Sequence, residues 1–137
     1  MPTTVTGGCL CGGVRYEVTG PFVSASYCHC TRCQRRTGTA ASAQARTEPS
    51  ALRIVRGAEL VREWTPPDEG WAKCFCSVCG GALWSRSRAE PPVFSVRLGS
   101  VDSDPGIRPE YRQFVAYAAA WEAIPDDGLP RHAERAS

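Results

Sequence analysis

Eight cysteines lie in three short clusters of the 137-residue chain, and their spacing suits a metal ion better than a network of disulfides. Zinc holds thiolate sulfurs about 2.3 Å away in a tetrahedron, and a C-x2-C turn presents two of them together. Cysteines so near in sequence rarely pair with each other, because disulfide geometry is narrow. Eight thiolates could fill two tetrahedral sites, or one closed site and one open site with a spare thiol. The clusters are Cys9 and Cys11; Cys28, Cys30 and Cys33; and Cys74, Cys76 and Cys79.

Two of the clusters each supply half of a closed site. Glycine pairs flank Cys9 and Cys11, and Gly80-Gly81 follows Cys79, so that the backbone can fold closely around a metal. Gly80 is expected to take the left-handed conformation that ends such a turn. Two thiolates cannot complete a tetrahedron, so each pair needs the other. We therefore expect a structural zinc site on Cys9, Cys11, Cys76 and Cys79, the alternative being ordinary buried cysteines.

The middle cluster, Cys28, Cys30 and Cys33, has the composition of an open site. Three thiolates can ligate one zinc ion and leave its fourth position free, which is the mark of a catalytic zinc. We expect these three cysteines to be metal ligands and the catalytic centre. His29 is expected to lie beside this metal rather than to bind it. Cys74 could be a buried apolar thiol, a fourth ligand or a reactive thiol.

Three arginines, Arg32, Arg35 and Arg36, directly follow this cluster. A divalent zinc with three thiolates carries about one net negative charge, which nearby arginines would offset while attracting an anionic ligand. They are our candidates for binding a small-molecule partner. The alternative is a solvated basic helix face. Lys73 is the only lysine among the 16 basic residues, and we make no functional prediction for it.

The bulk composition indicates one globular domain over residues 1–137. Hydrophobic residues make up 42% of the chain, which is ordinary, and the net charge of +2 is too small to indicate a nucleic-acid partner. No secretory signal and no apolar run of membrane-spanning length are visible. We therefore expect a cytoplasmic protein with no membrane partner, whose reducing surroundings keep the thiols free for metal. The oligomeric state is not predictable.

The elements that must position these cysteines are short strands separated by Gly, Pro, Asp and Ser turns, which indicates a mostly β fold. One short helix is expected over Thr31 to Arg36, ended by Gly38. The four tryptophans are expected in the core or in pocket walls, and the polar tail after Pro125 is expected to be partly loose. The expected strands are 14–18, 22–27, 40–45, 52–55, 60–64, 82–85, 93–98 and 111–118.

The three blocks around the cysteines resemble the glutathione-dependent formaldehyde-activating enzyme family, which includes centromere protein V. The resemblance covers most of the chain, with weaker matches at 98–102 and 120–121. It implies a zinc-bound β-tent fold of short antiparallel strands. It also implies the same division of the cysteines into a structural zinc site and a second zinc. The blocks are Gly8 to Tyr16, Cys28 to Gly38 and Phe75 to Leu83.

The resemblance implies a zinc-dependent carbon–sulfur lyase that joins formaldehyde, or a related aldehyde, to glutathione or a similar thiol. This chain departs from the family pattern at Cys74, an extra thiol, and in its compact length. Fold alone does not give function, so a second hypothesis stays open: a zinc-stabilised module that binds a partner without catalysis. A free fourth position on the second zinc favours the enzyme, and a fourth protein ligand there favours the module.

Overall fold

A computed structural model describes residues 3–136, and it confirms the mostly β fold of short antiparallel strands with one short α-helix. The described part contains ten strands, one α-helix and three 3-10 turns. None of its helices is both long and apolar enough to cross a membrane. The elements are β1 (Thr4–Gly8), β2 (Arg15–Thr19), β3 (Ser24–Cys28), α1 (Thr31–Thr37), β4 (Ser42–Arg46), β5 (Leu52–Arg56), η1 (Ala58–Leu60), β6 (Val61–Trp64), β7 (Ala72–Cys76), β8 (Ala82–Arg86), β9 (Phe94–Arg97), η2 (Leu98–Ser100), β10 (Arg112–Gln113) and η3 (Val115–Tyr117).

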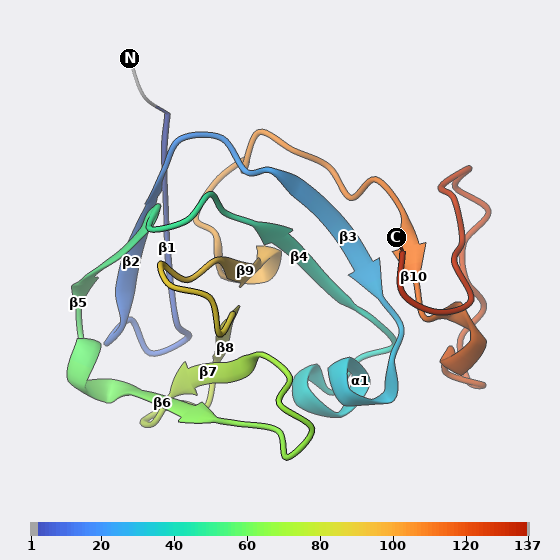
Figure 1. The fold of residues 1–137 in the computed structure, drawn as a ribbon, viewed down its shortest axis with the longest axis horizontal. Helices are drawn as coiled ribbons and strands as arrows, with labels where there is room; N and C mark the ends of the chain where they lie inside the picture. The colour runs from blue at the N-terminus through green and yellow to red at the C-terminus, as the bar shows by residue number, and fades with distance from the viewer. Residues whose placement is uncertain (1–2, 137) are drawn as a thin grey trace.

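The strands form two sheets. A three-stranded sheet has the order β1-β2-β5, and a seven-stranded sheet has the order β10-β3-β4-β9-β8-β7-β6. Every pairing is antiparallel except that of β10 with β3. In Figure 1 the small sheet lies on the left, and α1 lies below the ends of β3 and β4. The chain therefore carries α1 and the C-terminal segment at one side of the large sheet.

The apolar core joins one face of the large sheet to the small sheet. Tyr16 and Val18 of β2 are fully buried and belong to the same cluster as Trp84 of β8 and Val96 of β9. The rings of Tyr16 and Trp84 meet edge to face at 5.4 Å between centroids. Because successive strand residues point to opposite faces, the residues between these core positions must face the other side of the sheet.

That second face of the large sheet is polar. Its pairing register places Lys73 of β7 opposite Ser85 of β8, and Ser85 opposite Ser95 of β9. The same row continues from Ser95 to Arg46 of β4, and from Arg46 to Ser24 of β3. Residues paired across antiparallel strands lie on one face. The row is therefore a polar floor on the face opposite the apolar core.

Helix α1 begins at the predicted Thr31 and ends at Thr37, one residue beyond the predicted Arg36, with Gly38 following as predicted. Cys30 is its N-cap, with the side-chain sulfur accepting a hydrogen bond from the Cys33 backbone N–H. Gly38 ends it in the left-handed conformation at φ 69°, where a β-carbon would be strained. The helix thus starts inside the middle cysteine cluster, so its first turn sets the direction of those thiols.

Several sequence predictions differ from the structure. Strands β1 and β7 were not predicted, and the expected strand over 111–118 is reduced to β10, because Phe114 adopts a left-handed φ of 58° and the 3-10 turn η3 follows. Trp84 is in the core, but Trp64 and Trp121 are 51% and 71% exposed. The prediction is wrong for Trp121, whereas Trp64 lies in the wall of a groove beside Arg35.

The C-terminal segment after Pro125 has an irregular backbone but is bound to the sheet. Backbone hydrogen bonds join Arg112 of β10 to Pro130 and to His132, and Arg112 pairs with Asp127 at 2.7 Å. The Arg112 side chain is nearly buried and also stacks over Tyr27, 4.3 Å from the ring centroid. Residues 126–136 therefore lie against β10, at the edge of the large sheet.

Candidate metal centres

The four-cysteine group, Cys9, Cys11, Cys76 and Cys79, is assembled as the spacing predicts. Its four sulfurs lie within 4.8 Å of one another. The Cys9–Cys11 and Cys11–Cys76 sulfur separations are 3.6 and 3.9 Å. A tetrahedral zinc with sulfur about 2.3 Å away requires sulfur–sulfur separations of about 3.8 Å. The donor set and its dimensions therefore fit a closed thiolate metal site.

Two tight turns present these sulfurs. The backbone N–H groups of Val14 and Val78 point to the sulfurs of Cys9 and Cys76 at 3.2 and 3.4 Å. Gly80 has the predicted left-handed conformation, with φ 76°. Backbone hydrogen bonds from Cys11 and Gly81 lower the pKa of Cys79 to about 6. The turn at Cys79 thus favours the thiolate form of this residue, which a metal ion requires.

The three-cysteine group, Cys28, Cys30 and Cys33, is formed at the junction of β3 and α1. Cys28 ends β3, Cys30 caps the helix and Cys33 lies in its first turn. The three sulfurs lie within 4.8 Å of one another, and Cys28 is buried while the other two are partly exposed. No fourth Cys, His, Asp or Glu of residues 3–136 joins the group. It can therefore hold a metal ion and leave a position for a ligand.

The thiols of this group differ in their pKa values. Hydrogen bonds from Cys28 and Cys30 lower the pKa of Cys33 to about 2. The proton-sharing contacts with Cys30 and Cys33, together with burial, raise the pKa of Cys28. One sulfur is thus deprotonated at neutral pH, and a bound cation would release the remaining protons.

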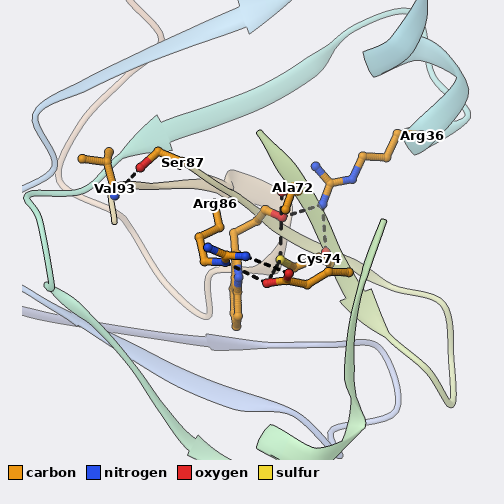
Figure 2. Close-up of polar contacts among 8 residues, drawn as sticks. Arg36, Ala72, Cys74, Arg86, Ser87 and Val93 are labelled. Atoms are coloured by element: carbon orange, nitrogen blue, oxygen red, sulfur yellow. Dashed lines mark hydrogen bonds and ion pairs between the residues drawn. The ribbon is translucent and has the colours of Figure 1, made fainter. Parts of the chain in front are cut away.

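His29 and Cys74 lie outside both groups. The buried ring of His29 meets the Arg112 guanidinium, with Nε2 3.1 Å from an Arg112 nitrogen. Its pKa is lowered by burial and by the positive charge of Arg112. Cys74 is fully buried in the core, and burial together with Glu63 raises its pKa to about 12. Figure 2 shows it beside Arg86. Of the three roles open to Cys74, the structure supports the buried apolar thiol.

A polar cavity of about 400 Å³ adjoins the three-cysteine group. This volume lies within the range of roughly 300–1,000 Å³ that small-molecule sites occupy. The polar floor of the large sheet forms one wall, and the C-terminal segment contributes Arg135. Among the described lining residues the charged side chains other than the cysteines are all basic: Arg32, Arg46, Lys73, Arg97 and Arg135. The cavity therefore favours an anionic ligand.

The three predicted arginines of α1 have different surroundings. Arg32 lines the cavity but pairs with Asp68 at 2.8 Å. Arg35 is exposed and lines a neighbouring groove with Trp64 and Phe75. Arg36 donates to the carbonyl oxygens of Cys74 and Trp84 at 2.8 and 2.7 Å, as Figure 2 shows for its approach to β7. Arg36 therefore also anchors the helix to the sheet.

Sequence reasoning missed three cavity residues: Lys73, Ser85 and Arg97. Arg97 is only 7% exposed, and Lys73 is partly buried. Lys73 is the only lysine of the chain, which was a weak signal of a special role. Alternate residues of β7 are buried, so Lys73 lies on the face of the sheet opposite Cys74. Arg97 stands at the end of a predicted strand, but its neighbours depend on strand pairing, which local patterns do not reveal.

Comparison with known proteins gives consistent matches. The family model described as "Glutathione-dependent formaldehyde-activating enzyme" matches residues 4–117. A curated Halomonas elongata protein whose name refers to the same activity is 28% identical over 103 residues, which are 72% of this chain. The chain spans about two thirds, 66%, of that relative's length. A crystal structure of a Rhodobacter sphaeroides protein has a TM-score of 0.61 at 26% identity, covering 93% of this chain and 98% of that one.

Proposed function

Because the chain belongs to the glutathione-dependent formaldehyde-activating enzyme family, we propose that it is a zinc-dependent carbon–sulfur lyase. Its substrates in this proposal are glutathione, or a similar acidic thiol, and formaldehyde or a related aldehyde. The observation that carries the proposal is the three-cysteine group, which has no fourth protein ligand among residues 3–136 and opens on a basic cavity. The reducing cytoplasm, where thiolates persist, is the proposed compartment.

The metal in this proposal is zinc in both groups. Thiolate-only donor sets at tetrahedral spacing are typical of zinc, and the four-cysteine group would hold the tighter ion. Cys28, Cys30 and Cys33 would hold the second ion, which, when bound, lowers the pKa of a coordinated thiol and polarises a carbonyl group.

The protein's own residues would bind and orient the thiol. The basic residues of the cavity attract the carboxylates, and the sulfur is thereby held beside the three-cysteine group. The sulfur lone pair forms a bond to the aldehyde carbon, and the carbonyl π electrons move to the oxygen. That oxygen takes up one proton, so the thiol proton is replaced by a hydroxyl proton in the S-hydroxymethyl product. No oxidant or reductant is needed.

The first prediction concerns metal content. Gently purified protein is expected to contain between one and two zinc ions per chain by elemental analysis, because one donor set is complete and the other has three ligands. Zinc lost during purification should come from the three-cysteine group. Folded protein with almost no metal would contradict both metal assignments.

The second prediction concerns the thiol. The zinc-loaded protein is expected to bind glutathione at least about tenfold more tightly than S-methylglutathione, a difference of about 1.4 kcal/mol, since the methyl group prevents the thiolate from binding the metal. Calorimetric titration measures both affinities, and carbon-13 NMR of labelled formaldehyde measures adduct formation above the uncatalysed rate.

Equal affinities for the two compounds would show that the thiol does not reach the metal. If neither compound binds at millimolar concentration, the non-catalytic binding module becomes the better hypothesis. Arg32 lines the cavity, whereas Arg35 of the same helix is exposed and lies outside it. Variants of these two arginines therefore form a matched pair for the same titration.

A further inference from the structure

Three cations from different elements converge on one buried hydroxyl group. The Ser85 Oγ lies 2.9 Å from an Arg36 guanidinium nitrogen, 3.1 Å from an Arg97 nitrogen and 3.5 Å from Lys73 Nζ. A serine oxygen has two lone pairs, so it can accept from only two of the three donors at once. Donor capacity is therefore left over at this point of the cavity wall.

The positive charge of this cluster is not balanced by protein carboxylates. Within residues 3–136, the other hydrogen bonds of Arg36 go to backbone carbonyls, and those of Arg97 go to Ser95. The Arg97 Nε has no partner in the same region, although the residue is buried. Burying an unpaired charge is costly unless a counter-charge is supplied.

The pKa values of Arg36 and Lys73 are lowered first by burial and then by neighbouring positive charge. Burial and the charge of Arg97 lower the pKa of Arg36 to about 10. Burial, followed by the charges of Arg97 and Arg36, also lowers the pKa of Lys73. An anion placed between these side chains would relieve both effects.

Lys73, Ser85 and Arg97 line the same cavity as the three-cysteine group, and Arg36 reaches the Ser85 hydroxyl group from outside that cavity. Three thiolates around a divalent metal carry about one negative charge, whereas the cluster carries three positive charges, so about two remain unbalanced. The neighbouring Arg32 pairs with Asp68, and Arg46 stacks 4.9 Å from the Trp71 ring centroid. Arg46 and Arg135 add further positive charge to the cavity, but the cluster brings three cations to one hydroxyl group.

We propose that Lys73 and Arg97 form a carboxylate-binding subsite, with Ser85 orienting the donors and Arg36 adding positive charge behind Ser85. Resting on the proposed function, this subsite holds a carboxylate of the thiol substrate while its sulfur lies beside the three-cysteine group. The subsite selects acidic thiols over neutral ones. Lys73 and Arg97 supply the free donors, since Arg36 is also committed to the backbone of β7 and β8.

The test compares glutathione with glutathione diethyl ester, which keeps the thiol and lacks both carboxylates. Calorimetry uses zinc-loaded wild-type protein, the Lys73→Met and Arg97→Met variants, and Arg88→Met as a control. Arg88 is exposed and lies outside the cavity. Wild-type protein is expected to bind glutathione roughly 10- to 100-fold more tightly than the diester, as for a charge-assisted hydrogen bond. Lys73→Met and Arg97→Met should lose most of this preference, and Arg88→Met should keep it.

Two results would overturn the subsite. One is a wild-type protein that does not distinguish glutathione from the diester. The other is a pair of variants that lose affinity for both compounds equally, because the cations would then act on the thiol or the metal group. Diester binding is expected to change by less than about twofold in the variants, which a general loss of structure would not allow.

Stability and metal content provide a second readout. Since a buried unpaired cation destabilises the fold, Arg97→Met should leave the melting temperature and zinc content unchanged or raised, and Lys73→Met, at a partly buried position, should leave both unchanged. A lower melting temperature with loss of zinc in both variants would show that the cations only balance the thiolates, which overturns the proposal. If Arg97→Met does not fold, the partly buried Lys73 position decides the test.

The outcomes also separate this proposal from the proposed function. Carboxylate preference that depends on Lys73 and Arg97, without adduct formation above the uncatalysed rate, would support the subsite and reject the lyase. Adduct formation that is equally fast with the diester and in both variants would support the lyase and reject the subsite.

Discussion

Cys79→Ser is expected to leave the protein unfolded at 25 °C, because it removes one thiolate from the four-cysteine group. Structural zinc in small domains contributes about 10–16 kcal/mol of apparent binding energy, which is of the same size as the net stability of about 5–15 kcal/mol of an ordinary domain. Cys79 is only partly buried, so the loss reports metal binding rather than packing. Circular dichroism and thermal melts measure the result.

The position of the group explains the size of this effect. Cys11 and Cys76 are 65 residues apart, and the group joins the turn after β1 to the turn after β7. A crosslink closing a loop of this length removes about 4 kcal/mol of unfolded-state entropy in the chain-entropy view. The three-cysteine group spans only six residues and closes a small loop, so its metal should contribute much less to folding.

Cys74→Ala is the matched control for this prediction. Cys74 is a fully buried cysteine on the strand that leads into the same group, but it belongs to neither group. Truncating it removes one buried sulfur, for which we expect a loss of about 1 kcal/mol. A Cys79→Ser variant that melts close to the Cys74→Ala variant would contradict a structural metal at the four-cysteine group.

The parts of the site that local sequence predicts are those made within short segments. Cys28, Cys30 and Cys33 converge because a strand end and one helical turn bring close neighbours together. Gly38 and Gly80 take left-handed conformations because each ends a helix or a tight turn, and both positions were predicted. The pairing of the two half-sites followed from the number of ligands that a tetrahedron requires.

The missed strands have physical explanations. β7 contains Cys74 and Cys76, which suggested a metal-binding turn, although alternate residues of the strand are buried with period two. β1 consists of Thr, Val and Gly residues with only Val5 and Gly7 buried, so it has little apolar signal. The expected long strand after Tyr111 stops at Gln113 because Phe114 reverses the backbone.

The cation cluster could not be predicted locally, because long-range register creates it. Lys73 meets Ser85 through the β7–β8 pairing, and Arg97 reaches the same hydroxyl from β9. Arg36 lies on α1, whose N-cap residue belongs to the three-cysteine group and whose C-cap residue is Gly38. The three-cysteine group thus indirectly positions a basic cluster that no local motif contains.

Cys30→Ser is the second variant with a large expected effect, and it should act on activity rather than on folding. Cys30 has two roles: its sulfur belongs to the three-cysteine group, and it caps α1 by accepting from the Cys33 backbone N–H at 3.3 Å. Serine is among the best N-cap residues, so the substitution keeps the cap and removes a thiolate. We expect a folded protein whose zinc content falls toward one ion per chain.

The rate of adduct formation by Cys30→Ser should fall at least about 100-fold. Changing a residue that only hydrogen-bonds to a metal ligand already lowers metal affinity or activity by about 10- to 100-fold. Cys74→Ala again serves as the control, since it alters a cysteine outside both groups and should keep both zinc ions. Elemental analysis, circular dichroism and the NMR rate measurement are needed on the same samples. Full activity with one zinc ion per chain would place the chemistry away from the three-cysteine group. A Cys30→Ser protein as unfolded as Cys79→Ser would show that the four-cysteine group is not structural and the three-cysteine group functional, but that both are needed for folding.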